Sequence, residues 1–394
     1  MTDPEPAVGP EHQPGTVSQP EHAADSMIEL AHVGKIFPGS ARPAVGDLSF
    51  VVPEGEIAVL IGPSGCGKST TLRMINRLIE PTSGTITVAG RDVHAVPAHE
   101  LRLGIGYVIQ QAGLFPHRTI AQNIGTVPRL LGWDKQRVGG RVDELMELVG
   151  LEQDLAERYP SELSGGQQQR VGVARALAAD PPVLLMDEPF GAVDPIVRAR
   201  LQGELLSLQQ RLHKTILFVT HDIDEAIRLG DRMAVLNVGG VLEQYGPPTE
   251  VLAAPASEFV VEFLGAERGL KRLSLIPVSE AKLDPGPVVA SSSSTSDARA
   301  VLDRERSDWV VVVDDGRLLG WVGEADLGPG TGRVGDAPVR PFAIRLRRQA
   351  TLREALDTLI SSPNRVAVVV DDDDRYLGLL DVTRIGDEIE MVDP

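Results

Sequence analysis

Residues 57–69 read IAVLIGPSGCGKS, and this stretch decides the fold. Its five apolar residues predict a buried strand, and the apolar pattern after Lys68 predicts a helix that includes Leu72, Ile75 and Leu78. The loop between them satisfies the pattern G-x-x-x-x-G-K-S in the strand–loop–helix context that the pattern needs. Glycines let backbone amides approach a phosphate, Lys68 brings a positive charge, and the Ser69 hydroxyl is a ligand for Mg²⁺. A glycine turn that merely closes a strand onto a helix is the alternative, and the matching context disfavours it.

A second chemical signal follows the apolar run Val183 to Met186, where the chain continues with Asp187 and Glu188. Carboxylates at the end of a buried parallel strand lie at the mouth of the sheet, where ligands bind. We expect Asp187 to hold Mg²⁺ and Glu188 to orient or deprotonate a water for attack on a phosphate. A solvated acidic turn is the alternative, and the phosphate loop makes it the weaker one.

A third signal is the segment LSGGQQQR over residues 163–170, which precedes a helical pattern that ends near Ala179. It places Ser164, Gly165, Gly166 and Gln167 at a helix N-terminus, where free amides and the helix dipole favour an anion. One nucleotide does not need two phosphate cradles in one domain. We therefore expect this second cradle to cover the nucleotide that another copy of the chain holds, with a plain helix cap as the alternative.

The chain beyond Gly265 reads like a second protein and contains a repeat. The helix pattern Ala298 to Leu302 is followed by the strand Trp309 to Val313, two aspartates and the strand Leu318 to Val322. A second copy runs from Leu352 to Leu380, and it has the same order of helix, apolar strand, acidic turn and glycine-containing strand. Each copy is too small to bury much alone, so we expect the two to pack on each other.

Composition bounds the function classes. The 394 residues allow two or three domains. The formal net charge of −18 excludes a non-specific nucleic-acid binder. One cysteine, Cys66, excludes a multi-cysteine metal site and is typical of a reducing cytosol. No apolar run reaches the ~20 residues that a membrane span needs.

The two ends of the chain differ from its middle. Residues 1–26 contain five acidic residues, five prolines and no lysine or arginine, which predicts a disordered leader rather than a signal peptide. Residues 371–394 contain nine acidic residues and two arginines, a net charge of −7. This block of charge predicts an acidic interaction or sensing tail.

The phosphate loop, the segment 163–170, the Met186-Asp187-Glu188-Pro189 strand end and Thr220-His221-Asp222 together resemble the ATPase subunits of ABC transporters over residues 28–265. The resemblance implies a nucleotide site for ATP and Mg²⁺. Its expected binding residues are Phe37, which would stack on adenine, Gly62, Pro63, Ser64, Gly65, Cys66, Gly67, Lys68, Ser69, Thr70 and the Q-loop residue Gln110. Ser69, Gln110 and Asp187 would hold the metal, Glu188, His221 and Lys68 would be catalytic, and Asp194 would lie at a dimer seam.

Three of these assignments have alternatives. Gln111 follows Gln110, so the Q-loop assignment can shift by one residue. Phe37 can be an ordinary core aromatic, and His221 can be a structural histidine.

The sequences of residues 74–84, 107–117 and 220–226 resemble, more narrowly, the importer subunits for quaternary amines such as glycine betaine, choline, carnitine and proline betaine. The C-terminal repeat is similar to a tandem pair of CBS modules, which several members of that subfamily carry. The resemblance implies a peripheral subunit at the cytoplasmic face of the membrane. Its partners would be integral permease subunits, a second ATPase subunit in a homodimer and, indirectly, an extracytoplasmic substrate-binding protein.

The expected architecture is an α/β P-loop NTPase domain with a helical subdomain, followed by a smaller α/β tandem CBS module. Its domains are a leader (1–26), an ABC ATP-binding domain (27–265), a first CBS repeat (270–330) and a second CBS repeat with the acidic tail (335–394). We expect the CBS pair to regulate transport by sensing ionic strength or an adenine nucleotide.

Other function classes remain open. The strongest rival is another ABC importer, for methionine, polyamines or sugars. A DNA-repair or chromosome ABC ATPase shares the motifs, but the long coiled coil and basic surface of that class are missing. A binding module that only senses adenylates is disfavoured because Lys68, Ser69, Asp187, Glu188 and His221 are all present. The solute carried is not encoded in motifs of this chain.

Overall fold

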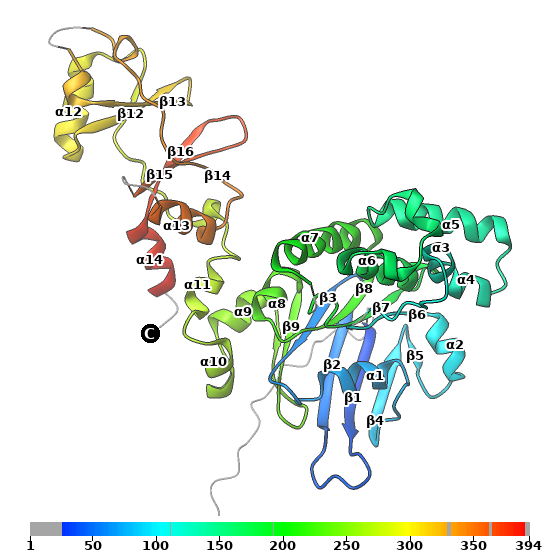
Figure 1. The fold of residues 1–394 in the computed structure, drawn as a ribbon. Helices are drawn as coiled ribbons and strands as arrows, with labels where there is room; N and C mark the ends of the chain where they lie inside the picture. Colours follow the sequence, from blue (N-terminus) through cyan, green and yellow to red (C-terminus); the bar gives the residue numbers. More distant parts are fainter. Residues whose placement is uncertain (1–25, 111, 192, 329–331, 362–364, 391–394) are drawn as a thin grey trace, which may run out of the picture. The chain divides into compact units, whose positions relative to one another are not determined.

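The computed structural model describes residues 26–110, 112–191, 193–328, 332–361 and 365–390. It divides into two compact units: the first ends at Leu264, and the second continues from Gly265 and includes residues 252–254 (Figure 1). The expected leader lies outside the described residues except for Ser26, which begins the first strand.

The centre of the first unit is a six-stranded sheet with the order β10-β9-β3-β8-β7-β6. Its strands are β3 (Ile57–Ile61), β6 (Ile105–Val108), β7 (Val183–Asp187), β8 (Thr215–Val219), β9 (Arg232–Asn237) and β10 (Val241–Gly246). All neighbours are parallel except β9 and β10. Strands β3, β7 and β8 are buried at every position, as their continuous apolar sequences predict. The segments that follow β3, β6, β7 and β8 therefore emerge at one edge of the sheet.

A second, four-stranded sheet has the order β2-β1-β4-β5. Its strands are β1 (Ser26–Lys35), β2 (Val45–Pro53), β4 (Ser83–Val88) and β5 (Arg91–Asp92), all antiparallel. Helix α1 (Lys68–Ile75) buries Leu72, Met74 and Ile75 in one core with residues of both sheets.

The sequence-based helix through Leu78 was too long. Helix α1 ends at Ile75 because Asn76 caps it and Arg77 takes a left-handed backbone with φ of 49°. Leu78 lies beyond the helix and is 48% exposed.

The other helices between residues 98 and 264 are α2 (Ala98–Leu103), α3 (Ile120–Ile124), α4 (Thr126–Leu130), α5 (Lys135–Leu148), α6 (Gly165–Leu177), α7 (Pro195–Leu212), α8 (Ile223–Leu229), α9 (Pro248–Ala253) and α10 (Glu258–Leu264). Helices α3, α4 and α5 gather with α6 at one end of the unit (Figure 1). Asn123 of α3 is fully buried and donates to the carbonyls of Phe115, Arg118 and Thr119, which fixes the loop that enters this helical part. Among the described residues, no helix combines the length and the apolar character that crossing a membrane requires.

The second unit contains the predicted repeat. After α11 (Arg268–Arg272), its elements are β11 (Val288–Ala290), α12 (Thr295–Glu305), β12 (Trp309–Asp314), β13 (Arg317–Gly323), β14 (Arg345–Arg347), α13 (Leu352–Ile360), β15 (Val366–Val370), β16 (Tyr376–Asp381) and α14 (Val382–Glu390). The two sheets have the orders β11-β12-β13 and β14-β15-β16. In each sheet the first pair is parallel and the second antiparallel, so the repeated order of elements is confirmed.

The two copies pack on each other, as expected. Val311 and Leu318 of the first copy form one buried cluster with Val368, Val370 and Leu379 of the second. Their hairpin turns are also joined, because the Leu318 amide donates to the Asp374 carbonyl at 2.9 Å and the Tyr376 amide donates to the Gly316 carbonyl at 3.0 Å.

The acidic block is a folded part of the second copy over residues 371–390, which differs from the expected tail. Residues 376–390 form β16 and α14. In the turn before them, the Asp371 carboxylate accepts the amides of Asp373 and Arg375, and Asp374 lies 3.1 Å from the Arg347 guanidinium. The acidic residues are consecutive in the sequence because a tight hairpin turn and a solvated strand end need polar residues there.

Candidate nucleotide site

The predicted site residues of the central sheet meet at one edge. Lys68 and Ser69 follow β3, Gln110 follows β6, Asp187 and Glu188 lie at the end of β7, and His221 follows β8. Strands β3, β8, β7 and β6 are neighbours in that order. The topology therefore brings together four segments that are far apart in sequence.

The phosphate loop, residues 62–69, has the geometry of an anion cradle. Gly67 has φ of 102°, and a Cβ there would lie 2.6 Å from the Ala44 carbonyl, so only glycine fits. It stands at the N-cap of α1 without any side-chain cap, which leaves the first amides of the helix for a ligand. Ser64 and Gly65 are exposed, Cys66 is buried, and Pro63 and Thr70 are half-buried.

The Lys68 side chain folds back onto the start of the phosphate loop. Its side chain is 7% exposed, and the ammonium donates to the carbonyls of Gly62 at 2.7 Å and Pro63 at 3.1 Å. Within the described residues, no carboxylate lies within 4.0 Å of this ammonium. A buried cation whose hydrogen-bond partners are carbonyl groups is stabilised when an anion arrives, which fits the phosphates of a nucleotide.

Ser69 and Asp187 form an adjacent pair of oxygen ligands. The Ser69 hydroxyl donates to Asp187 Oδ1 at 2.8 Å. Burial raises the pKa of the Asp187 carboxyl, and the hydrogen bond from Ser69 and the positive charge of Arg73 only partly oppose this. A hydroxyl beside a buried carboxylate that lacks a full counter-charge is a donor set that suits Mg²⁺, so these residues fit the expected ion.

Glu188 lies between Gln110 and His221 at the edge of the sheet. Its Oε2 accepts a hydrogen bond from Gln110 Nε2 at 3.1 Å, and its Oε1 lies 3.3 Å from His221 Nδ1. Its backbone has φ of 46°, a left-handed conformation that costs a non-glycine residue about 1–2 kcal/mol. The Glu188 amide donates to the Val219 carbonyl of β8 at 2.9 Å, which holds this conformation. Gln111, the alternative to Gln110, lies outside the described residues.

A buried network supports the His221 segment, and sequence reasoning missed it. The Glu225 carboxylate accepts the Thr220 hydroxyl at 2.6 Å and the Gln202 amide at 3.0 Å. Glu225 and Gln202 are each 5% exposed. In the sequence, Glu225 stands at the third position of a helix, where a glutamate usually caps the N-terminus. Asp222 makes that cap here, because it accepts the amides of Asp224 and Glu225.

Two expected site segments, Ser164 to Gln167 and Asp194, form hydrogen bonds within their own helix ends. Ser164 caps α6 and forms a reciprocal capping box with Gln167, at 3.3 Å and 2.9 Å. Gly165 has open space where a Cβ would be, and Gly166 lies near Val197. Asp194 caps α7 by accepting the Ile196 amide at 2.9 Å, and Ile196 is 83% exposed.

Phe37 lies on the loop between β1 and β2. Its side chain is 38% exposed, and the Lys35 ammonium lies 5.2 Å from the centre of its ring. The alternative of an ordinary core aromatic is therefore wrong, and the ring offers a free surface to a ligand.

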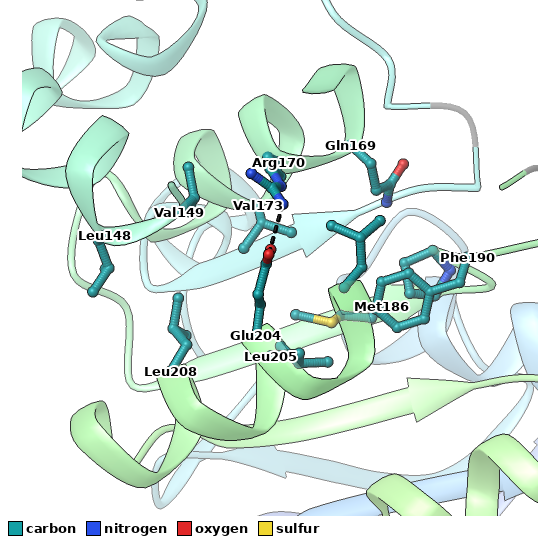
Figure 2. A pocket seen from close by; sticks show the side chains of 12 residues that line it. Leu148, Val149, Gln169, Arg170, Val173, Met186, Phe190, Glu204, Leu205 and Leu208 are labelled. Atoms are coloured by element: carbon teal, nitrogen blue, oxygen red, sulfur yellow. Dashed lines mark hydrogen bonds and ion pairs between the residues drawn. The ribbon is translucent and has the colours of Figure 1, made fainter. Parts of the chain in front are cut away.

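A small apolar cavity of about 40 Å³ lies behind the end of β7, between α6 and α7 (Figure 2). Met186 and Phe190 line it on the strand side, and the Arg170–Glu204 ion pair of 2.6 Å joins the two helices across it. Helix α6, which Ser164 caps, thus lines the same cavity as the segment that carries Asp187 and Glu188.

Comparisons with known proteins agree with this geometry. The family model for ABC transporters matches residues 45–191, and that for the CBS domain matches residues 334–389. A solved dimeric structure of an ATP-binding cassette, in a post-hydrolysis state with ADP and Pi, is similar to the chain with a TM-score of 0.51 and 33% identity. The similarity covers 56% of this chain and 98% of that one.

Curated relatives match nearly the whole chain. The osmoprotectant import ATP-binding protein OsmV of Salmonella typhimurium is 48% identical over 368 residues, which cover 92% of this chain and 96% of OsmV. The glycine betaine/carnitine/choline transport ATP-binding protein OpuCA of Bacillus subtilis is 44% identical over 90% of this chain and 94% of OpuCA. The chain therefore belongs to the ATP-binding subunits of ABC transporters, in the group whose members include osmoprotectant importers, and it pairs an ABC ATPase fold with a CBS domain.

Proposed function

We propose that the chain is the ATP-hydrolysing subunit of an importer for quaternary amine osmoprotectants such as glycine betaine, choline, carnitine or proline betaine. The observation that carries this proposal is the extent of the likeness to OsmV and OpuCA, which includes the C-terminal CBS region as well as the ATPase. Accordingly we assign residues 27–265 to the ATPase, 270–330 to a first CBS repeat and 335–394 to a second, with 1–26 as a leader.

In this proposal the residues of the sheet edge divide the work of hydrolysis. The Lys68 ammonium and the backbone N–H groups of residues 62–70, except Pro63, which has none, bind the phosphates of ATP, and Phe37 stacks on the adenine. Ser69, Asp187 and Gln110 hold Mg²⁺, which would neutralise charge on the phosphates. Glu188 takes the proton of the attacking water, and His221 contacts the terminal phosphate. The 3.3 Å separation of Glu188 Oε1 and His221 Nδ1 supports this division, because it places the proposed base and the proposed phosphate contact side by side at the sheet edge.

We also propose that two copies close head to tail over two ATP molecules. Ser164, Gly165, Gly166 and Gln167 of one copy would then cover the nucleotide bound by Lys68 of the other, with Asp194 at the seam. The uncrowded Gly165 and the 83% exposure of Ile196, two residues after Asp194, support a surface that a partner covers.

A groove of about 350 Å³ is the proposed docking place for the integral membrane subunits. Gly113, Phe115, Val127 and Arg175 are among the residues that line it. Two consecutive leucines beyond it are exposed, Leu130 by 75% and Leu131 by 40%, and together they offer apolar surface to a partner. Docking here would place the chain at the cytoplasmic face of the membrane, with an external substrate-binding protein reached only through the permease.

The experiment that tests the proposal is uptake of labelled solutes into membrane vesicles that contain this chain with its permease. The panel is glycine betaine, choline, carnitine, proline, methionine and a polyamine, at low and high osmolarity. We expect quaternary amine uptake that needs ATP, rises with osmolarity and is lost with Lys68→Ala. Uptake of methionine or the polyamine alone would overturn the substrate class and leave the ATPase assignment in place.

Regulation by the CBS pair is a separate part of the proposal. Charge pairs such as Asp374–Arg347 are exposed, and salt screens such pairs over a Debye length of ~8 Å at ~0.15 M ionic strength. ATP hydrolysis by the assembled importer, measured against ionic strength and against added AMP, tests whether the unit responds to either. Unchanged rates in both series would remove this role.

A further inference from the structure

A cleft of about 640 Å³ lies within the second unit, between the sheet of the first repeat and the segment that leads into β14. This volume falls inside the range of about 300–1,000 Å³ that is usual for small-molecule sites. The cleft is separate from the nucleotide site, which belongs to the first unit.

Aromatic rings line this cleft. The chain has only three tryptophans, and two of them, Trp309 and Trp321, are in its wall together with Phe342. Val311 is paired with Trp321 across β12 and β13, so Trp309, two residues from Val311, lies on the same sheet face as Trp321. Phe342 meets Trp309 edge to face, with ring centres 5.8 Å apart. Three ring systems of this kind form part of a cage for a cation.

The charges of the cleft favour a cation over a phosphate. Among the described residues that line it, three are acidic (Asp308, Glu324 and Asp326) and one is basic (Arg340). Arg340 pairs with Asp326 at 3.0 Å, and its guanidinium lies 5.1 Å from the centre of the Trp321 ring. A delocalised cation therefore already rests on one ring of the cleft, whereas a polyphosphate would meet a net negative wall.

We propose that this cleft binds a quaternary ammonium compound. The ammonium group lies among Trp309, Phe342 and the carboxylate of Asp308, and the carboxylate of a zwitterion such as glycine betaine pairs with Arg340. The choice of ligand rests on the proposed function. The CBS unit, on the ATPase side of the membrane, would bind the same class of solute that the importer transports. A high internal concentration of the solute would then act directly on the ATPase subunit by filling this cleft.

The second repeat provides an internal comparison. Aligned on the Val-Val-Asp-Asp turns and the glycines Gly320 and Gly378, Trp309 corresponds to Val366 and Trp321 to Leu379. The bridge between Trp321 and Arg340 corresponds to the bridge between Leu379 and Asp284. The aromatic and basic residues are thus particular to the first copy, and the fold of a repeat does not require them.

Calorimetric titration of the full chain, without nucleotide, tests the proposal. The probes are choline, glycine betaine and the uncharged tert-butyl isostere of choline, in which carbon replaces nitrogen at nearly unchanged shape. We expect choline and glycine betaine to bind, and the isostere to bind about tenfold more weakly or worse, because it lacks the charge that the rings attract. Equal binding of choline and its isostere would overturn the proposal, as would no binding of either amine up to about 10 mM.

Variants locate the binding. The double substitution Trp309→Val and Trp321→Leu installs the residues of the second repeat. We expect loss of choline binding of about tenfold or more in a variant whose second unit still unfolds cooperatively. Trp133→Leu, in the first unit, is the matched control and keeps binding. Arg340→Gln weakens glycine betaine more than choline, and this difference remains a test if the double variant fails to fold. Retained binding in a folded double variant, or binding of AMP alone that the variant abolishes, would overturn the proposal.

The uptake assay separates this inference from the proposed function. Binding of choline by the isolated chain, with no uptake of any quaternary amine, would overturn the proposed function alone. Uptake of quaternary amines with no binding by the isolated chain would overturn the cleft assignment alone.

Discussion

The Ser69 hydroxyl donates a hydrogen bond of 2.8 Å to the Asp187 carboxylate across 118 residues of sequence. This bond joins the phosphate loop after β3 to the end of β7, and β8 lies between those two strands in the sheet. The fold itself therefore places the loop that would hold phosphate next to the carboxylate that would hold the metal.

Replacement of Asp187 by Asn should change the thermal stability of the free chain and its stabilisation by Mg²⁺ with ATP in opposite directions. Since burial raises the pKa of Asp187, the folded chain holds this proton more tightly than the unfolded chain does. The ionised carboxylate thus opposes folding, and the stability of the wild type falls as the pH rises from 3.8 through the raised pKa. We expect Asp187→Asn to have a higher Tm than wild type at neutral pH without nucleotide, yet to gain less Tm than wild type from Mg²⁺ with ATP, because one of the three proposed metal ligands has lost its charge. Thermal unfolding at pH 4 and pH 7 checks both, and a lower Tm for the variant at pH 7 would contradict the argument.

Glu188→Gln removes the proposed base while keeping its size. We expect ATP hydrolysis to fall by about 10²–10⁴-fold, because a carboxamide does not take the proton of water. ATP binding remains, so ATP should trap a dimer that size-exclusion chromatography detects. Glu144→Gln, an exposed residue of α5, is the control with unchanged rate. A hydrolysis rate near that of wild type in Glu188→Gln would remove the assigned role.

Phe37→Ala tests adenine stacking. An aromatic stacking contact contributes about 0.5–1.5 kcal/mol, so we expect KM for ATP to rise about 2- to 10-fold with little change in kcat. Because Phe37 is 38% exposed, its removal should change the free energy of unfolding by less than about 0.5 kcal/mol. Steady-state kinetics with Phe37→Tyr as the conservative control decides the matter, and an unchanged KM in Phe37→Ala would exclude stacking.

Glu225→Gln tests the buried support of the His221 segment. The Thr220 hydroxyl accepts the Asp222 amide at 3.0 Å, so its own proton must go to residue 225. A carboxamide has one acceptor atom for two donors, Thr220 and Gln202, and leaves one buried donor unsatisfied at a cost of about 1–3 kcal/mol. We expect a lower Tm and a lower kcat with a smaller change of KM. Glu258→Gln, an exposed residue at the start of α10, is the control and should leave Tm, kcat and KM unchanged. The same result in Glu225→Gln would show that the network does not affect the site.

Gly320→Ala tests the junction of the two repeats. A Cβ at this position, where φ is 156°, would lie 2.2 Å from the Arg340 carbonyl and would push apart the bridge between Trp321 and Arg340. We expect the second unit to lose about 2 kcal/mol or more of stability, while basal ATP hydrolysis is unchanged. Gly328→Ala, which meets nothing within 4 Å, is the control. Calorimetric unfolding should show one transition lowered in Gly320→Ala and neither lowered in Gly328→Ala.

Local sequence was sufficient for parts of the site and insufficient for others. The phosphate loop and the acidic strand end could be predicted because their chemistry lies in short consecutive segments. The contacts of Glu188 with Gln110 and His221 depend on which strands are neighbours, and only the sheet order reveals them. The burial of Glu225 could not be predicted, since a glutamate at that helix position usually faces solvent as a cap.

In the second unit, too, some features could be predicted from the sequence and others could not. The repeat was visible in the sequence because strand, acidic turn and glycine recur in order. The aromatic cleft was not, because it requires the register that places Trp309 and Trp321 on one face and the packing that brings Phe342 to them. The repeat predicts the acidic turn and the strand that follows it, whereas the helix α14 (Val382–Glu390) was not predicted, because its acidic residues were taken as part of a tail.

Cys66, the sole thiol of the chain, lies fully buried in the phosphate loop with its sulfur 3.6 Å from the Lys68 ammonium. A maleimide or other alkylating probe can reach it only when this loop opens, so the labelling rate reports opening of the loop without any engineered residue. The native cysteine thus reports on the opening of the phosphate loop, and a fluorophore attached elsewhere through an introduced cysteine would not compete for label while the loop is closed.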